Sequence, residues 1–142
     1  MNVERITTAD DALVAALVRL VPQLSPRRRP PSREELGELI AAPGTSLFVA
    51  RDADDLLGML TLVVYRVPTG LRGWIHDVVV DGDARGRGVG EALTRAALDE
   101  ASEAGVETVH LTSRPQREAA NRLYRRLGFE ELETNVYVWR PG

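Results

Sequence analysis

Apolar residues recur along most of the chain at the spacings of helices and strands, so the pattern predicts an alternation of the two. Leu13, Leu17 and Leu20 repeat every three or four residues until Pro22, which indicates an amphipathic helix near the start of the chain. A capping box that opens at Thr8 marks where this helix is expected to begin.

A second helix and a hairpin are predicted next. Ser32 and Glu35 have the spacing of a second capping box, and the helix that follows them is expected to end near Pro43. Two apolar runs then flank a short turn of mostly acidic residues, which indicates two antiparallel strands. These strands are predicted over Ser46–Arg51 and Leu56–Val67.

The middle of the chain predicts a parallel pair of strands. Trp74–Val80 is strongly apolar and lies between turn signals, as expected of a buried strand. The helix behind it carries an apolar stripe and ends at Gly105, and Val106–Thr112 is the next predicted strand. Because a helix joins the two strands, they are expected to run parallel.

One more helix and two short strands complete the predicted order. The helix can begin at Pro115 and ends at Gly128, and the strands cover Phe129–Leu132 and Thr134–Trp139. No repeat or linker separates the elements. They predict one α/β domain over residues 1–142, with a mixed sheet covered by helices on both faces.

The composition is typical of a soluble globular protein. Of the 142 residues, 44% are hydrophobic and 27% are charged. No apolar run approaches the roughly 20 residues that a membrane span needs. Residues 1–11 lack the basic start and the apolar stretch of a secretory signal, so we expect a cytoplasmic protein without a membrane partner.

Residues that the chain lacks exclude several chemistries. Without cysteine the chain can form no disulfide and no thiolate metal site, and with His76 and His110 as its only histidines we expect no metal. All 18 basic residues are arginine, so there is no lysine for a Walker loop or a Schiff base. The formal charge of -3 argues against nucleic acid as a partner.

The most informative motif joins the end of the buried strand to the helix behind it. It runs from Arg85 to Gly90, and we call it the glycine loop. At the start of a helix, backbone N–H groups lack partners and the helix dipole favours negative charge, so an anion fits there. Three alternating glycines let a phosphate approach the backbone, and Arg85 and Arg87 can add charge-assisted hydrogen bonds. We therefore expect a pyrophosphate at the glycine loop.

Two common phosphate loops do not match the glycine loop. A dinucleotide-binding fingerprint would need glycine or alanine where Glu91 stands, and a Walker loop would need lysine. The pattern that matches is Arg-x-x-Gly-x-Gly, carried by Arg85, Gly88 and Gly90. On this pattern, and on the elements around it from Trp74 to Phe129, the chain resembles the GNAT superfamily of acyl-CoA-dependent N-acyltransferases.

The resemblance implies a fold, a co-substrate and a set of binding residues. The implied fold is a GNAT-like α/β domain whose central sheet of about six to seven strands is flanked by four helices, and the implied co-substrate is acetyl-CoA. In that family the strand before the loop offers main-chain groups to the pantetheine arm, the loop binds the pyrophosphate, and a later helix carries an asparagine and a tyrosine. The matching residues are Val78, Val79, Val80, Arg85, Gly86, Arg87, Gly88, Val89, Gly90, Asn121 and Tyr124.

Acyl transfer to an amine requires a base. An alkyl amine with a pKa near that of lysine, about 10.4, must lose a proton before it attacks a thioester. His76 is the first candidate, because imidazole suits proton transfer at neutral pH and because its strand should flank the acyl group. Asp77 and an ordered water remain alternatives. Strand alternation places His76 with Val78 on one face and Asp77 with Val79 on the other.

The leaving thiolate and the oxyanion also need partners. Tyr124, three residues after Asn121 on the same predicted helix face, is the candidate that donates a hydrogen bond or a proton to the sulfur. The backbone N–H of Val78 is the candidate for the oxyanion. His76 and Tyr124 are therefore the predicted catalytic side chains.

The amine acceptor is the least specified part of the prediction. In similar proteins the segment that corresponds to Leu24–Pro31 and the second helix roof the acceptor site, and the run from Arg27 to Arg29 hints at an acceptor with an anionic group. A small-molecule amine is favoured. The alternatives are a protein N-terminus or lysine, a non-catalytic acyl-CoA-binding role, and charged tRNA.

A second copy of the chain is a further candidate partner. The apolar run Val136–Trp139 lies on the last predicted strand and can either pair with another subunit or be covered within the fold.

Overall fold

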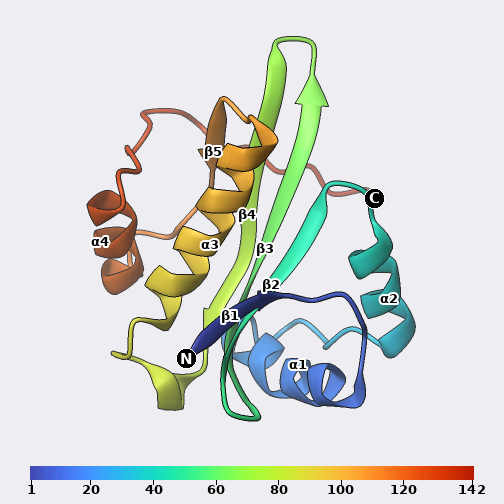
Figure 1. Ribbon diagram of the computed structural model, residues 1–142. Helices are drawn as coiled ribbons and strands as arrows, with labels where there is room; N and C mark the ends of the chain where they lie inside the picture. Colours follow the sequence, from blue (N-terminus) through green and yellow to red (C-terminus); the bar gives the residue numbers. More distant parts are fainter. The chain divides into compact units, whose positions relative to one another are not determined.

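The computed structural model describes residues 1–142 and divides into two compact units (Figure 1). The first unit comprises Met1–Thr112 and contains the whole sheet, and the second comprises Ser113–Gly142. No helix in either unit combines the length and the apolar character that crossing a membrane requires.

The first unit contains a five-stranded mixed sheet in the order β1-β2-β3-β4-β5. Strands β1 to β4 pair antiparallel with one another in this order, and β4 and β5 run parallel. The long β3–β4 hairpin extends past the other strands in Figure 1. The strands are β1 (Asn2–Arg5), β2 (Thr45–Asp52), β3 (Asp55–Val67), β4 (Gly70–Val80) and β5 (Thr108–His110).

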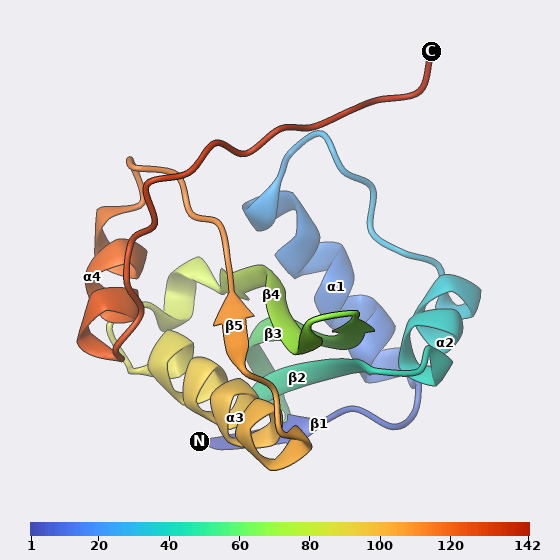
Figure 2. The ribbon, with the colours of Figure 1, turned by 90° about the horizontal axis from the view of Figure 1, so that it is seen from above.

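Helices cover both faces of this sheet, as predicted. Helices α1 (Asp11–Leu24) and α2 (Arg33–Ala41) lie on one face, and α3 (Val89–Ala104) lies on the other (Figure 2). The crossover through α3 makes β4 and β5 parallel, as expected of a strand–helix–strand connection. The apolar side chains buried between α1, α2 and the sheet include Leu13, Leu17, Leu20, Leu36, Leu47, Val49, Met59 and Val79.

Local sequence determines where these helices begin. The capping box of α2 is confirmed: the Glu35 N–H donates to Ser32 Oγ at 3.1 Å, and the Ser32 N–H donates to Glu35 Oε1 at 2.9 Å. Helix α1 starts later than predicted, because Asp10 rather than Thr8 caps it and accepts from the Leu13 N–H at 2.9 Å.

The end of α1 also differs from the prediction. Pro22 lies inside the last turn of the helix, which continues to Leu24. A proline so close to the end removes one intrahelical hydrogen bond, and the helix ends two residues later.

The predicted number of strands, six to seven, was too high. The predicted strands at Phe129–Leu132 and Thr134–Trp139 do not form, because no neighbouring strand pairs with either segment. Tyr137 and Trp139 are among the most exposed apolar side chains, at 86% and 83%. A segment with strand-forming residues becomes a strand only when another strand supplies its hydrogen bonds.

Other predicted bounds also differ from the structure, and β4 begins at Gly70, four residues before the predicted start at Trp74. The predicted strand Val106–Thr112 is limited to the three residues of β5, and the four-residue β1, which pairs with β2, was missed. In the second unit α4 (Glu118–Arg126) begins three residues after Pro115, behind a turn in which the Arg117 N–H donates to the Arg114 carbonyl at 3.0 Å.

Gly58 on β3 lets α3 approach the sheet closely. A Cβ atom at this position would lie 2.7 Å from the Val79 carbonyl oxygen and 3.1 Å from Val89 Cγ1. Because Val79 is on β4 and Val89 opens α3, this close approach fixes both ends of the connection that holds the glycine loop.

We predict opposite effects on stability for alanine at two glycines. Gly58→Ala should lower the free energy of unfolding by about 1–3 kcal/mol through overpacking. Gly37→Ala, in the interior of α2 with open space around the new methyl group, should raise it by about 0.5–1 kcal/mol. Urea unfolding of both variants measures the difference, and a neutral Gly58→Ala would contradict the close approach.

Candidate active site

A β-bulge interrupts β4 next to His76, the predicted base. Met59 pairs with Val79 and Thr61 pairs with His76, so β4 uses one residue more than β3 between these two pairs. The extra residue sits at Asp77, whose φ of 51° lies in the left-handed region. Such a bulge leaves backbone groups outside the strand ladder.

The bulge corrects the predicted alternation along β4. His76 pairs with Thr61 and Val79 pairs with Met59, and these two β3 residues are two apart and point to the same face. Ile75 pairs with Leu62, which is three residues from Met59 and points to the other face. Val79 therefore shares a face with His76 and not with Ile75. This is the face that α1 covers, because Met59 and Val79 both belong to its core.

The outer edge of β4 is also free beside the bulge. Strand β5 pairs with β4 only over Arg72–Trp74, so no strand lies against the outer edge of β4 from Ile75 to Val80. Main-chain groups of Val78, Val79 and Val80 are on this part of the strand. The end of β4 can therefore offer backbone hydrogen bonds to a ligand that lies along it.

His76 belongs to a stack of three rings on the sheet. The Trp74 ring lies 6.0 Å from the His76 ring and 5.3 Å from the His110 ring, with interplanar angles of 21° and 16°. The His76 side chain is exposed, and neither it nor the exposed Asp77 carboxylate forms a hydrogen bond with the protein. The His76 ring nitrogens are therefore available to a substrate or a water.

The glycine loop presents backbone N–H groups without protein partners. Gly86 and Gly88 both have a φ of 78°, which turns the backbone into the left-handed region that glycine adopts without a steric penalty. Gly88 caps α3, and no side chain occupies the cap. No backbone carbonyl or side chain accepts a hydrogen bond from the Gly86 amide or the Gly88 amide.

The loop therefore combines free donors with the positive end of a helix. The first N–H groups of α3, those of Val89 and Gly90, continue the series because the first turn of a helix lacks internal acceptors. A phosphate or pyrophosphate fits this arrangement of donors, and the buried Ala84 and Val89 anchor the loop on either side.

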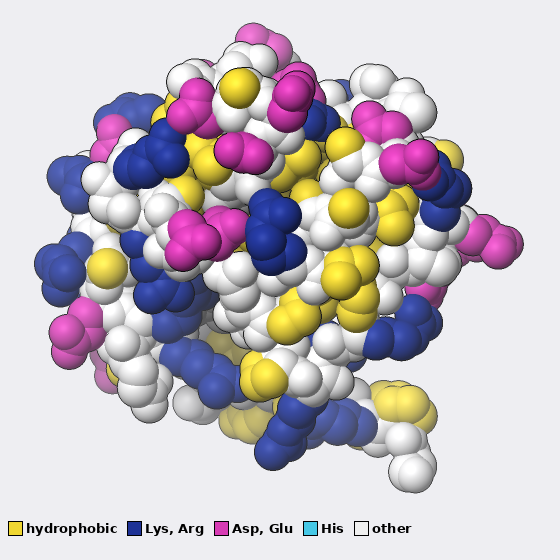
Figure 3. Space-filling view, turned by 90° about the horizontal axis from the view of Figure 1, so that it is seen from below, with side chains coloured by type: hydrophobic (Ala, Val, Ile, Leu, Met, Phe, Trp, Pro, Cys, Tyr) yellow, Lys and Arg dark blue, Asp and Glu magenta, His cyan; other side chains and the backbone are white.

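The two arginines of the loop differ. Arg87 Nη2 donates to Asp52 Oδ2 at 2.6 Å in an ion pair with both side chains about half exposed. Such an exposed pair contributes little stability, so a phosphate can replace the carboxylate. Arg85 is exposed and forms no ion pair. In the view from below, arginine side chains lie next to acidic ones at several places (Figure 3).

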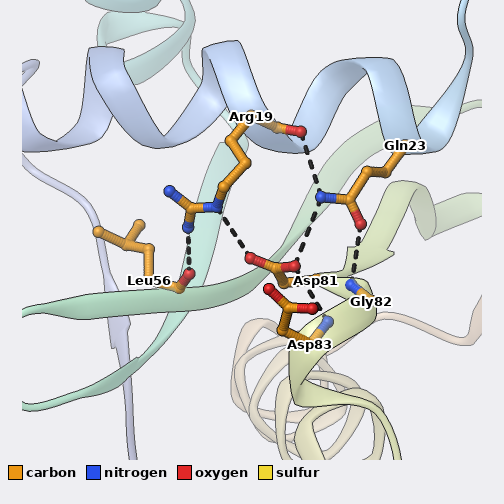
Figure 4. Close-up of polar contacts among 6 residues, drawn as sticks. All are labelled: Arg19, Gln23, Leu56, Asp81, Gly82 and Asp83. Atoms are coloured by element: carbon orange, nitrogen blue, oxygen red, sulfur yellow. Dashed lines mark hydrogen bonds and ion pairs between the residues drawn. The ribbon is translucent and has the colours of Figure 1, made fainter.

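A hydrogen-bond network between α1 and the end of β4 was missed by sequence reasoning. We call it the Asp81 network. Arg19 Nε donates to Asp81 Oδ2 at 2.8 Å, and Arg19 Nη2 donates to the Leu56 carbonyl at 2.6 Å (Figure 4). The Arg19 hydrogen bond, followed by that of the Asp83 N–H, holds the pKa of the Asp81 carboxyl below its ordinary value.

Gln23 completes the Asp81 network one helical turn later. Its Nε2 donates to the Arg19 carbonyl at 3.2 Å and to Asp81 Oδ1 at 3.5 Å, and its Oε1 accepts from the Gly82 N–H at 2.9 Å. The partners are about 60 residues apart in the sequence, so no local pattern signals them.

The loop between α1 and α2 carries the basic run noted in the sequence. Arg29 forms two hydrogen bonds with the Glu35 carboxylate, at 2.8 and 2.9 Å, and these, followed by the Ser32 N–H, lower the pKa of Glu35 to about 2. Arg27 and Arg28 are exposed and form no ion pair. Within the run from Arg27 to Arg29, Arg27 and Arg28 are therefore the two arginines that are free to bind an anionic group.

The second unit carries Asn121 and Tyr124 on α4. Asn121 Nδ2 donates to the Arg114 carbonyl at 3.0 Å, while its Oδ1 receives no hydrogen bond from the protein. The Tyr124 ring is 7% exposed and packs edge-on against Phe129 at 5.7 Å. Burial raises the pKa of the Tyr124 hydroxyl, an effect that Arg117 partly offsets.

Comparison with known proteins identifies the family. The model of the acetyltransferase (GNAT) family matches residues 13–129. A mycothiol acetyltransferase of Sanguibacter keddieii is 33% identical over 121 residues, which is 78% of this chain and 37% of that protein. N-alpha-acetyltransferase 30 of Schizosaccharomyces pombe is 37% identical over 84 residues, which is 58% of this chain and 55% of that protein. The matched stretches thus span about half or less of these relatives.

A solved structure shows the same fold. An aminoglycoside acetyltransferase from an uncultured soil metagenomic sample, in complex with sisomicin, superposes with a TM-score of 0.83 at 23% identity and covers 99% of this chain and 95% of that one.

We predict a backbone cost for a side chain at the glycine that caps α3. Gly88→Ala has open space for its methyl group, so the left-handed backbone alone should lower the free energy of unfolding, by about 1–2 kcal/mol. Gly88→Asn should lose less, because asparagine tolerates this region. Gly105→Ala, at the other end of the helix with a φ of 83°, is the matched control and should lose as much. Thermal or urea unfolding that finds Gly88→Ala as stable as the wild type would contradict the left-handed cap.

Proposed function

This chain belongs to the acetyltransferase (GNAT) family, and from that membership we propose that it transfers the acetyl group of acetyl-CoA to the primary amine of a small molecule. The transfer proceeds by direct attack of the amine on the thioester while both substrates are bound. The family match over residues 13–129 supports the reaction class. The site residues and the amine acceptor are our own assignments.

The observation that carries the proposal is the series of unpartnered amides in the glycine loop. A pyrophosphate accepts hydrogen bonds from several N–H groups at once, and the helix dipole of α3 adds favourable electrostatic energy. We assign Gly86, Gly88, Val89 and Gly90 as backbone donors. Arg85 and, once released from Asp52, Arg87 supply charge-assisted hydrogen bonds.

The free edge of β4 supports a path for the pantetheine arm from the loop to the bulge. Val79 and Val80 lie between the bulge and the loop, on the part of the strand that β5 leaves unpaired. An extended arm along this edge would form strand-like hydrogen bonds and place the thioester near Val78. We assign the Val78 N–H to the oxyanion of the tetrahedral intermediate.

We assign His76 as the base that deprotonates the amine. It precedes the bulge, its side chain is exposed, and its ring has no hydrogen-bond partner in the protein. Asp77 is also exposed and unpaired, and a water between His76 and the amine is a second route for the proton. The amine then attacks the carbonyl carbon, and the C–S bond breaks as the tetrahedral intermediate collapses.

We assign Tyr124 as the donor to the leaving thiolate of CoA. A phenol whose pKa is raised by burial keeps its proton at neutral pH and can donate it. The Tyr124 hydroxyl forms no hydrogen bond within the protein, so it is not committed to a structural partner. Asn121, three residues earlier, is assigned to the cofactor through the carbonyl side of its amide.

A small-molecule acceptor is the favoured class. The mycothiol acetyltransferase and the aminoglycoside acetyltransferase are named for small molecules, and both resemble this chain over most of its length. Arg27 and Arg28 suit an amine that also carries an anionic group. The likeness to N-alpha-acetyltransferase 30 favours one alternative, the N-terminal amine of a protein.

Thiol release from acetyl-CoA in the presence of an amine panel tests the proposal. The panel includes amino sugars, polyamines, amino acids and peptides with free N-termini. Steady thiol release with at least one small amine supports the proposal, and release only with peptides supports the alternative. Binding of acetyl-CoA without release with any amine would indicate a non-catalytic role.

We predict that His76→Ala slows turnover by about a hundredfold at neutral pH, which is the lower end of a general base's contribution. The deficit should shrink as the pH approaches the pKa of the amine, about 10.4, because the free amine then needs no base. CoA affinity should not change. His110→Ala removes the histidine on the other side of Trp74 and is the control. A pH–rate profile of His76→Ala that parallels the wild type would remove His76 from the mechanism.

For Tyr124→Phe we predict a loss in kcat with little change in the KM for acetyl-CoA. The substitution keeps the ring against Phe129 and removes only the proton donor. The loss should diminish with an acyl donor whose thiol is more acidic, because such a leaving group needs less protonation. Initial rates with the two donors measure this, and equal losses with both would make the hydroxyl structural.

A further inference from the structure

We propose that the Asp81 network positions the glycine loop, so that Arg19 and Gln23 of α1 control the affinity for acetyl-CoA without contacting it. The inference rests on the proposed function, because it assumes that the loop binds CoA. It assigns to α1 a task that neither the family match nor the loop motif indicates.

The glycine loop has few interactions of its own. Its residues from Arg85 to Gly88 are exposed, its Gly86 and Gly88 amides have no protein acceptors, and both glycines permit many backbone conformations. The ion pair between Arg87 and Asp52 is itself about half exposed and constrains the loop little. The conformation that aligns the amides must therefore be fixed by the segments on either side. On the α3 side the buried Val89 fixes it.

On the β4 side the fixing contacts converge on Asp81. Its N–H donates to the Leu57 carbonyl at 2.8 Å, and its carbonyl accepts from the Ala84 N–H at 2.8 Å. Its carboxylate accepts from the Asp83 N–H at 3.2 Å and thereby caps the short helical turn Gly82–Ala84 that leads into the loop. Asp81 thus determines the direction in which the chain leaves the sheet.

Helix α1 holds the Asp81 carboxylate in this position. Arg19 bonds both that carboxylate and the Leu56 carbonyl, so it joins the turn to β3. Gln23 bonds the carboxylate and the Gly82 N–H with opposite ends of one amide group. As Figure 4 shows, both side chains reach from the helix toward the start of the turn. The Asp81 side chain is 14% exposed and the Arg19 side chain 47% exposed, so this pair lies at the surface and acts by fixing geometry more than by adding stability.

Loss of the network should cost binding through preorganisation. A loop that samples several conformations must be ordered when the ligand binds, and the ordering lowers the affinity. The chemical step should not change, because none of the network residues reaches the acyl group or the amine. The signature is therefore a raised KM for acetyl-CoA at constant kcat.

The test compares Arg19→Met and Gln23→Met with the control Arg5→Met. Arg5 is also an arginine of the first unit, about half exposed and paired with Glu100 at 3.3 Å, but it lies on β1 outside the network. Calorimetry with CoA gives the dissociation constant, initial rates with acetyl-CoA give KM and kcat, and amide hydrogen exchange reports the order of residues 82–90. Gln23→Met leaves no charge unpaired, so it keeps the test open if Arg19→Met folds poorly.

We expect both network variants to raise the dissociation constant of CoA and the KM about three- to tenfold. In both variants kcat should stay within about twofold of the wild type, and exchange at residues 82–90 should become faster. Arg5→Met should match the wild type. If the wild type binds CoA and the network variants bind it equally well, the inference is wrong and the proposed function stands. If the wild type does not bind CoA, the proposed function itself fails.

Discussion

Backbone amides that have no acceptor within the protein are the feature on which the rest of this structure depends. They lie in the glycine loop and at the first turn of α3, and the left-handed glycines Gly86 and Gly88 give the loop its shape. Free amides are normally satisfied by water or by a ligand, and several of them at a helix N-terminus favour an anion over water. The fold supports this short segment from both sides, through the close packing of α3 at Gly58 and through the Asp81 network.

Strand β4 joins this anion site to the proposed site of chemistry. The bulge at Asp77 lies four residues before Asp81, and the loop begins four residues after it. A single strand would thus set the distance between the proposed phosphate site and the proposed catalytic residues. The bulge also puts His76 and Val79 on one face, so the proposed base stands on the side of the sheet that α1 and α2 cover.

Much of the first unit could be predicted from the sequence, because its signals are local. The capping box at Ser32, the glycine at the end of α3 and the apolar run of β4 each act within a few residues. The bulge could not be predicted, since a left-handed aspartate has no distinct local signal. The Asp81 network could not be predicted either, because it joins residues from separate elements that lie about 60 residues apart in the sequence. The strands expected after Phe129 fail for a related reason, because pairing depends on a partner and strand propensity alone does not supply one. The assignments of His76, Asn121 and Tyr124 remain predictions.

The most direct measurement of the central claim is an NMR titration of the amide groups of residues 85–90. With CoA, these amides should show the largest saturable shifts in the protein, and with pantetheine, which lacks the pyrophosphate, they should barely move. Glycine amides resonate in a separate region of the spectrum, so Gly86, Gly88 and Gly90 can be followed individually. If CoA binds while these three amides keep their free-state shifts, the phosphates are held elsewhere and the account of the glycine loop is wrong.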